Sequence, residues 1–242
     1  MKQDILASIE NTIAAGEDVL LSGLSGSART FFIHAIISKR RSKMLCMVPS
    51  EEIAYDLARE LKALLGEKRV FLFLVRDFVF MKENPSLSEV QRVLTLQDLL
   101  DHPQRQAVII TTPGALLYNI MTPWAMQDRA ITLEIGQETA IAELLTGLVA
   151  AGYQRVDTVT RPGQFAARGG LVDVYPAGDR EPYRIDFFGD TIDIIKRFDL
   201  NTQRSTRQEN QIVIHPCDEI QGAAAEASLL DYLPDNSLIY FD

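Results

Sequence analysis

The stretch "SGLSGSARTFF", residues 22–32, joins an apolar run to a segment with helical periodicity. A nucleotide-binding loop of the Walker type has the pattern G-x-x-x-x-G-K-[ST]. In it, glycines let backbone N–H groups surround the phosphates, the Lys reaches the terminal phosphates and the hydroxyl holds magnesium. Here the frame runs from Gly23 to Thr30, but Ala28 replaces the second Gly and Arg29 replaces the Lys. The stretch therefore predicts the fold of a phosphate loop, while these two replacements argue against tight nucleotide binding.

The members of this degenerate phosphate loop are Gly23, Gly26, Ala28, Arg29 and Thr30. An Ala adds a Cβ where the backbone comes closest to the ligand, and an Arg presents a long planar fork where a compact ammonium is wanted. We interpret the loop as a strand-to-helix turn that has lost its ligand, with a weak anion site as the alternative. Asp242 ends the run "SLIYFD" and could hold magnesium, but such runs are common in ordinary strands. We predict no catalytic residue, metal or cofactor for this chain.

The first 120 residues alternate between helical and strand patterns, which is typical of a parallel sheet covered by helices. Ser50 and Gly66 predict the start and the end of one of the helices. Short apolar runs are interpreted as core strands, namely residues 18–24, 43–49, 69–75 and 106–113. We therefore predict the α/β class, with a parallel sheet flanked by helices and opened by the degenerate phosphate loop.

The pattern changes near residues 121–125, where a single helical segment precedes alternating segments punctuated by Gly and Pro. These segments predict a smaller α+β domain with a curled antiparallel sheet. Buried-strand character returns from residue 211. We predict an α/β domain of residues 1–121 plus 211–242, into which an α+β domain of residues 122–210 is inserted. Because the sequence stops at the end of a predicted strand, we expect it to be part of a longer protein.

Composition excludes several classes of protein. The formal net charge of −9 disfavours broad electrostatic attraction to nucleic acid, although a local basic patch stays possible. Cys46 and Cys217 lie far apart in the sequence, and the three histidines are scattered, so neither a disulfide framework nor a zinc spacing is present. No apolar run approaches the length of a membrane span. We expect a cytoplasmic protein without a membrane partner.

Residues 152–205 resemble the UvrB-interaction domain that the excision-repair protein UvrB shares with the bacterial transcription-repair coupling factor. The matching elements follow in order: "GYQRVDTV", "PGQFAARGGLVDVYPAG", "PYRIDFFGD", "IIKRFD" and "TQRS". UvrB keeps an intact phosphate loop, so the loss of the Lys favours a likeness to the coupling factor. The resemblance implies a non-catalytic interaction module that recruits UvrA. In the full-length parent it implies further partners, namely RNA polymerase, double-stranded DNA and the parent's own C-terminal domain, and a motor that uses ATP and magnesium and is absent here.

The resemblance also implies which residues contact UvrA. It places Arg155 and Arg168 on two contact arginines and Phe165 beside them as an apolar contact, while a third arginine of UvrB corresponds here to Ala166. Arginine suits an interface because its rigid fork matches carboxylates. From the residues alone these arginines, with Arg161, would be read as solvated strand charges. The alternative function is a UvrB-like domain of helicase type that binds nucleotide and DNA.

Overall fold

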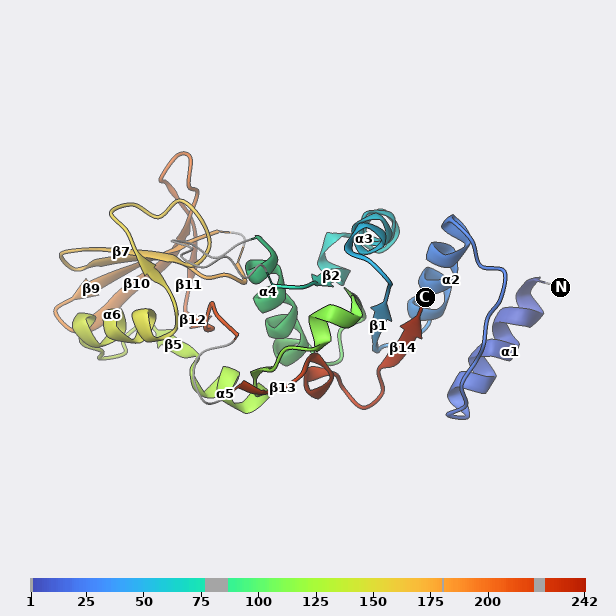
Figure 1. The fold of residues 1–242 in the computed structure, drawn as a ribbon. Helices are drawn as coiled ribbons and strands as arrows, with labels where there is room; N and C mark the ends of the chain where they lie inside the picture. Colours follow the sequence, from blue (N-terminus) through green and yellow to red (C-terminus); the bar gives the residue numbers. More distant parts are fainter. Residues whose placement is uncertain (1, 77–86, 180, 220–224) are drawn as a thin grey trace. The chain divides into compact units, whose positions relative to one another are not determined.

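The structure, a computed structural model, describes residues 2–76, 87–179, 181–219 and 225–242 (Figure 1). It divides into two compact units. The first unit comprises Met1–Leu72, His102–Pro113 and Leu233–Asp242, and the second comprises Phe73–Asp101 and Gly114–Tyr232. Both units are discontinuous in sequence, and each is described by itself.

The first unit is built on a four-stranded sheet in the order β14-β1-β3-β2. Its strands are β1 (Lys43–Met47), β2 (Val70–Phe73), β3 (Ala107–Thr111) and β14 (Leu238–Phe241). Strand β1 pairs in parallel with both β3 and β14. Every residue of β3 is buried, as expected for a parallel strand covered on both faces. The predicted parallel sheet flanked by helices is confirmed.

The first unit contains helices, and one of them begins and ends at residues that favour a helix start and a helix end. They are α1 (Lys2–Ala14), α2 (Ser27–Ser38), α3 (Glu51–Leu65) and the short 3-10 helix η1 (Glu67–Arg69). The Ser50 side chain accepts a hydrogen bond from the Ile53 N–H at 3.3 Å, which caps α3. Gly66, with φ of 90°, ends the helix. Both predicted ends of this helix are therefore confirmed.

The prediction of a core strand at residues 18–24 is wrong, because residues 17–25 form neither helix nor strand. Leu20 is 97% exposed, and strand β14 is the described neighbour of β1 on that side of the sheet. Val19, Leu21 and Leu24 instead line a cavity of about 960 Å³ together with residues of α1, α2 and β14. The apolar run is thus explained by partial burial over this cavity, and such a run does not by itself distinguish a strand from an extended segment.

The second unit contains a six-stranded sheet in the order β11-β10-β9-β8-β7-β6. The strands are β6 (Gln154–Arg155), β7 (Gln164–Arg168), β8 (Leu171–Tyr175), β9 (Tyr183–Phe188), β10 (Thr191–Phe198) and β11 (Ser205–Glu209). All neighbours are antiparallel except β6, which runs parallel to β7. One face carries the fully buried side chains of Phe165, Val172, Val174 and Ile185. The predicted antiparallel sheet is confirmed.

Other elements of this part of the chain are shorter, apart from one long helix. They are α4 (Leu87–Asp101), η2 (Pro113–Leu116), β4 (Ile120–Met121), α5 (Pro123–Asp128), β5 (Ile131–Glu134), α6 (Ile141–Ala150), β12 (Gln211–Ile214), β13 (Ala225–Ala227) and η4 (Leu229–Tyr232). Figure 1 shows the single predicted helix, α6, beside the sheet. No helix among the described residues is long and apolar enough to cross a bilayer.

The boundaries of the compact units differ from those of the predicted domains. Residues 73–101, 114–121 and 211–232, which were predicted in the first domain, group with the second unit, and after residue 210 only 233–242 return to the first. Two contacts hold these three segments to one another. The guanidinium of Arg92 on α4 forms an ion pair with Glu219, and both side chains are almost completely buried. The Tyr232 hydroxyl donates to the Met121 carbonyl at 2.6 Å. Neither contact has a local sequence signal.

Candidate functional site

The turns of two hairpins in the second unit lie at the same end of the sheet. The first joins β7 to β8 through Gly169 and Gly170, and Gly169 has a φ of 59° that suits glycine. The second joins β9 to β10 through Gly189 and Asp190. Because β8 and β9 are antiparallel, with Leu171 opposite Asp186, both turns lie at one end of the sheet. Arg168, the last residue of β7, stands at this end.

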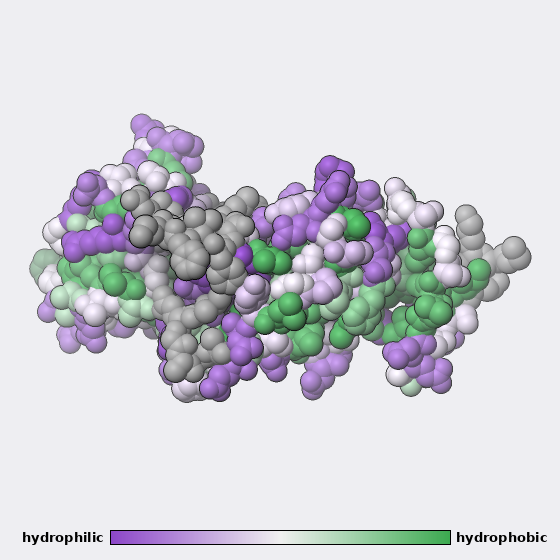
Figure 2. All heavy atoms as spheres, viewed as in Figure 1, coloured by the Kyte–Doolittle hydropathy of each residue, from purple (hydrophilic) through white to green (hydrophobic). Residues whose placement is uncertain are grey.

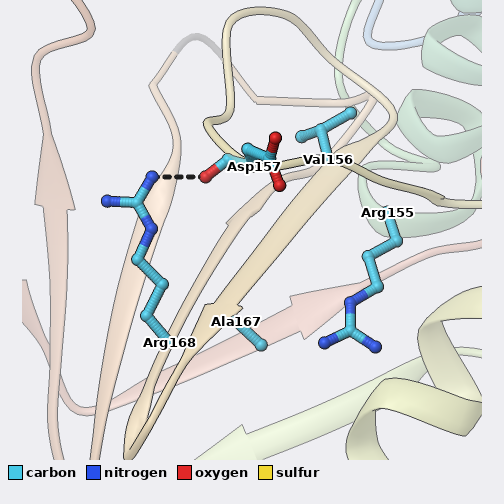
Figure 3. A pocket seen from close by; sticks show the side chains of 5 residues that line it. All are labelled: Arg155, Val156, Asp157, Ala167 and Arg168. Carbon is cyan, nitrogen blue, oxygen red and sulfur yellow. Dashed lines mark hydrogen bonds between the residues drawn. The ribbon is translucent and has the colours of Figure 1, made fainter.

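Arg168 is exposed but held in place. Its Nη2 donates a hydrogen bond to the Thr158 hydroxyl at 2.8 Å and a second one to the Asp157 carbonyl. Figure 3 shows the guanidinium of Arg168 turned toward Asp157, in the loop that follows β6. Arg168 therefore fixes the loop after β6 and still presents part of its fork to solvent.

Arg155 lies on the short strand β6, opposite Phe165 of β7. Its side chain is exposed and has no hydrogen bond or ion pair with any residue in the described ranges. In Figure 3 the guanidinium groups of Arg155 and Arg168 point in opposite directions, with Ala167 between the two side chains. Both arginines nevertheless line one surface pocket of about 660 Å³, together with Val156, Asp157 and Ala167. The structure thus brings the two predicted contact residues to one site.

Phe165 is fully buried, so its side chain is not available to a partner. Its position opposite Val174 on the core face of the sheet explains this, because a strand presents alternate residues to opposite faces. This placement corrects the expectation of an apolar contact at Phe165. Ala166 stands where UvrB has a third arginine. It is buried with Val159 and Tyr175 in a small cluster on the other face of the sheet. An arginine side chain would not fit this cluster without displacing it.

Arg161 is half-buried, and its Nη2 lies 3.5 Å from the Gln154 Oε1. This distance is at the long end of hydrogen-bond range, so the contact restrains the side chain weakly. Arg161 does not line the pocket between Arg155 and Arg168.

The degenerate phosphate loop keeps its turn geometry. Gly23 and Gly26 have φ values of 82° and 54°, and Gly26 precedes the first residue of α2. However, Arg29 forms an ion pair with the Asp242 carboxylate, and the Thr30 hydroxyl donates a hydrogen bond to Glu60. The two side chains that would meet a phosphate and its magnesium are thus engaged by carboxylates of the protein. Ala28, the first-turn residue before Arg29, donates its N–H to the Ser25 carbonyl at 3.2 Å.

Asp242 is the site residue that sequence reasoning set aside. Its signal was an acid at the end of a hydrophobic run, and the parallel pairing of β14 with β1 brings that acid to the start of α2. The Tyr240 hydroxyl also donates to Asp242 at 3.1 Å. Burial, together with the neighbouring Asp242 charge, raises the pKa of Tyr240 to about 12. The hydroxyl therefore stays protonated, and remains a donor, at neutral pH.

Comparison with known proteins gives a family match within the second unit. Residues 131–219 match the family model of the UvrB interaction domain. This segment is therefore similar to UvrB interaction domains. The match contains the whole six-stranded sheet, and so both arginines of the pocket.

Relatives of the chain fall into two groups of DNA-repair proteins. The chain is 29% identical over 224 residues to the transcription-repair-coupling factor of Bacillus subtilis, which covers 90% of this chain and 19% of the relative. It is 28% identical over 212 residues to the UvrABC system protein B of Thermosipho africanus, with 82% of this chain and 32% of the relative covered. The chain thus spans about a fifth of the first relative and about a third of the second, and it is similar to both groups.

Proposed function

We propose that the UvrB interaction domain of this chain docks onto UvrA, and that the chain is the recruiting module of a transcription-repair coupling factor. The observation that carries the proposal is the pocket flanked by Arg155 and Arg168, two exposed arginines of the domain that the family model matches. The partner surface that fits this pocket carries carboxylates.

Charge and preorganisation support this proposal. In a chain of net charge −9, two cationic forks on one pocket provide a local site for an acidic surface. An Arg–carboxylate contact is charge-assisted and can be bidentate, which adds geometric specificity. Arg168 is already positioned by Thr158, so it loses little side-chain entropy on binding, whereas Arg155 is free to adapt to the partner.

A catalytic role is not part of the proposal. With Arg29 paired to Asp242 and Thr30 paired to Glu60, a nucleotide would have to break both contacts before it met either side chain. We infer that the chain itself binds no nucleotide. A titration with labelled ATP and magnesium up to millimolar concentration is expected to show no saturable binding, and saturation in the micromolar range would favour the UvrB-like alternative.

Under this proposal the wider activity belongs to the full-length parent. Contacts with RNA polymerase, double-stranded DNA and the parent's C-terminal domain, and the use of ATP by a translocase motor, would come from the parent's further domains. The proposal also places the protein in the cytoplasm, where bacterial DNA repair takes place.

The test is co-elution of this chain with purified UvrA from the same organism in size-exclusion chromatography. The wild-type chain is expected to shift to the complex, and the double variant Arg155→Glu/Arg168→Glu is expected to elute alone. Circular dichroism of the variant shows whether its fold is retained. A wild-type chain that never co-elutes at high micromolar concentration would overturn the proposal.

A further inference from the structure

Phe188 is a large apolar residue that the fold leaves uncovered. It ends strand β9 beside the turn at Gly189, and 83% of its side chain is exposed. Among the described residues of the second unit no other large apolar residue is more exposed. The hairpin does not need an aromatic side chain at this place, because the turn geometry is supplied by Gly189, whose φ is 63°.

Phe188 shares a face and an end of the sheet with Arg168. Arg168 pairs with Leu171, and Leu171 pairs with Asp186, so these three residues lie on one face. Phe188 lies two residues beyond Asp186 and returns to that face. Two strand spacings and two residues of rise place Phe188 roughly 12 Å from Arg168 along the sheet. One partner surface can therefore meet both side chains.

The two hairpin ends are joined to each other by their backbones. The Phe187 N–H donates to the Gly170 carbonyl at 2.8 Å. A Cβ on Gly170 would lie 3.0 Å from the Phe187 carbonyl oxygen, so a side chain at position 170 would push the ends apart. This contact presents Phe188 at a fixed position relative to Arg168, which lowers the entropy that a partner must remove on binding. Figure 2 shows hydrophobic and hydrophilic residues side by side at the left-hand end of the sheet, where hairpins end in Figure 1.

We propose that Phe188 is an apolar anchor for UvrA, seated in an apolar pocket of the partner while Arg168 binds a carboxylate beside that pocket. This inference rests on the proposed function and adds a residue to its interface. Aromatic and Arg side chains are enriched among the residues that dominate binding energy, which matches the pair offered here. Asp190, exposed at the same turn, further predicts a cationic group on the opposite rim of the partner's pocket.

The experiment measures the dissociation constant of this full chain for purified UvrA by biolayer interferometry. Phe188→Ala is expected to weaken binding by about 10- to 100-fold, the range for losing a fully buried Phe side chain. The matched control is Val149→Ala, which removes another exposed apolar side chain, on α6 (58% exposed), and is expected to leave the affinity unchanged. Phe188→Leu keeps an apolar anchor and is expected to retain most of the affinity. Because Leu is also a large apolar side chain, this variant tests the proposal if the alanine variant melts early.

The outcomes separate this inference from the proposed function. Wild-type affinity in Phe188→Ala, with binding lost in Arg155→Glu/Arg168→Glu, would overturn the anchor and leave the arginine pocket in place. Equal weakening by Phe188→Ala and Val149→Ala would also overturn it. Failure of the wild-type chain to bind UvrA would overturn both.

Discussion

Arg29, at the position of the Walker lysine, is ion-paired with Asp242 at the end of strand β14. Both side chains are about one-fifth exposed, so the pair is shielded from solvent more than an ordinary surface ion pair. Removing Arg29 would leave the partly buried Asp242 carboxylate without this cation. We expect Arg29→Ala to lower the free energy of unfolding by about 1–2 kcal/mol, measured by urea denaturation.

A double-mutant cycle isolates this pair from the other effects of each substitution. Asp242→Asn is the second arm, and the cost of the double variant is expected to be less than the sum of the two single costs. Strict additivity would show that the ion pair does not contribute to stability.

Replacing Arg168 is expected to cost more stability than replacing Arg155, although both side chains are proposed to bind UvrA. Arg168 donates to Thr158 and Asp157, so Arg168→Glu should cost about 1 kcal/mol of stability in addition to weakening UvrA binding. Arg155 has no partner among the described residues, so Arg155→Glu should weaken binding and leave the melting temperature unchanged. Thermal melts monitored by circular dichroism check both statements. An equal loss of stability in the two variants would contradict the assigned contacts.

Restoring the third arginine is expected to fail at Ala166. This side chain is 4% exposed and packs with Val159 and Tyr175. Ala166→Arg would overfill the cluster and bury a charge, at a cost of about 2–4 kcal/mol in stability. Chemical denaturation checks the cost, with Ala167→Arg, at the half-buried neighbouring position on the strand, as the milder control. A stable Ala166→Arg variant with tighter UvrA binding would contradict the packing described here.

Lys43, fully buried at the start of β1, makes stability depend on pH. Burial, and then the nearby charge of Arg105, lower its pKa to about 8, below the usual value of 10.5. Between these two values the unfolded chain binds more protons than the folded chain, so stability rises with pH. The buried thiols of Cys46 and Cys217 oppose this rise, because burial raises their pKa and the unfolded thiols ionise in the same interval. We therefore expect the contribution of Lys43 to appear as a difference in unfolding free energy between the wild-type chain and Lys43→Met that grows from pH 8 to about pH 9.5, below the range where unfolded tyrosines ionise.

The variant Lys43→Met supplies the control for this pH dependence. It has no ammonium to titrate, so its unfolding free energy should fall relative to that of the wild-type chain over the same interval. Denaturant titrations at matched pH values make the comparison. The same pH dependence in both proteins would assign the effect to groups other than Lys43.

Local chemistry in the sequence predicted much of the fold. The cap at Ser50, the stop at Gly66 and the buried runs of β1 and β3 are properties of neighbouring residues, and the structure has them where expected. The run at residues 18–24 wrongly predicted a core strand. A segment that is partly buried over a cavity and a strand that is buried in a sheet contain the same apolar residue types.

The candidate site was predicted less completely because it depends on register and on long-range pairing. The register of β7 decides that Phe165 faces the core, and a shift of one residue would reverse every side chain of the strand. The pair between Arg29 and Asp242 joins residues 213 positions apart, for which one sequence carries no signal. The exposure of Phe188 likewise depends on where its hairpin lies in the sheet, which the sequence alone does not give.

Binding of UvrA is proposed to take place at the pocket of Arg155 and Arg168. The most direct measurement is the dissociation constant for UvrA of the wild-type chain and of Arg155→Glu/Arg168→Glu, with Arg59→Glu as a control. Arg59 is an exposed arginine on α3, 77% accessible, so its substitution makes the same change of charge on the first unit. We predict that the folded double variant loses binding by at least about 100-fold and that Arg59→Glu binds as the wild type does. Wild-type affinity in the folded double variant would contradict it.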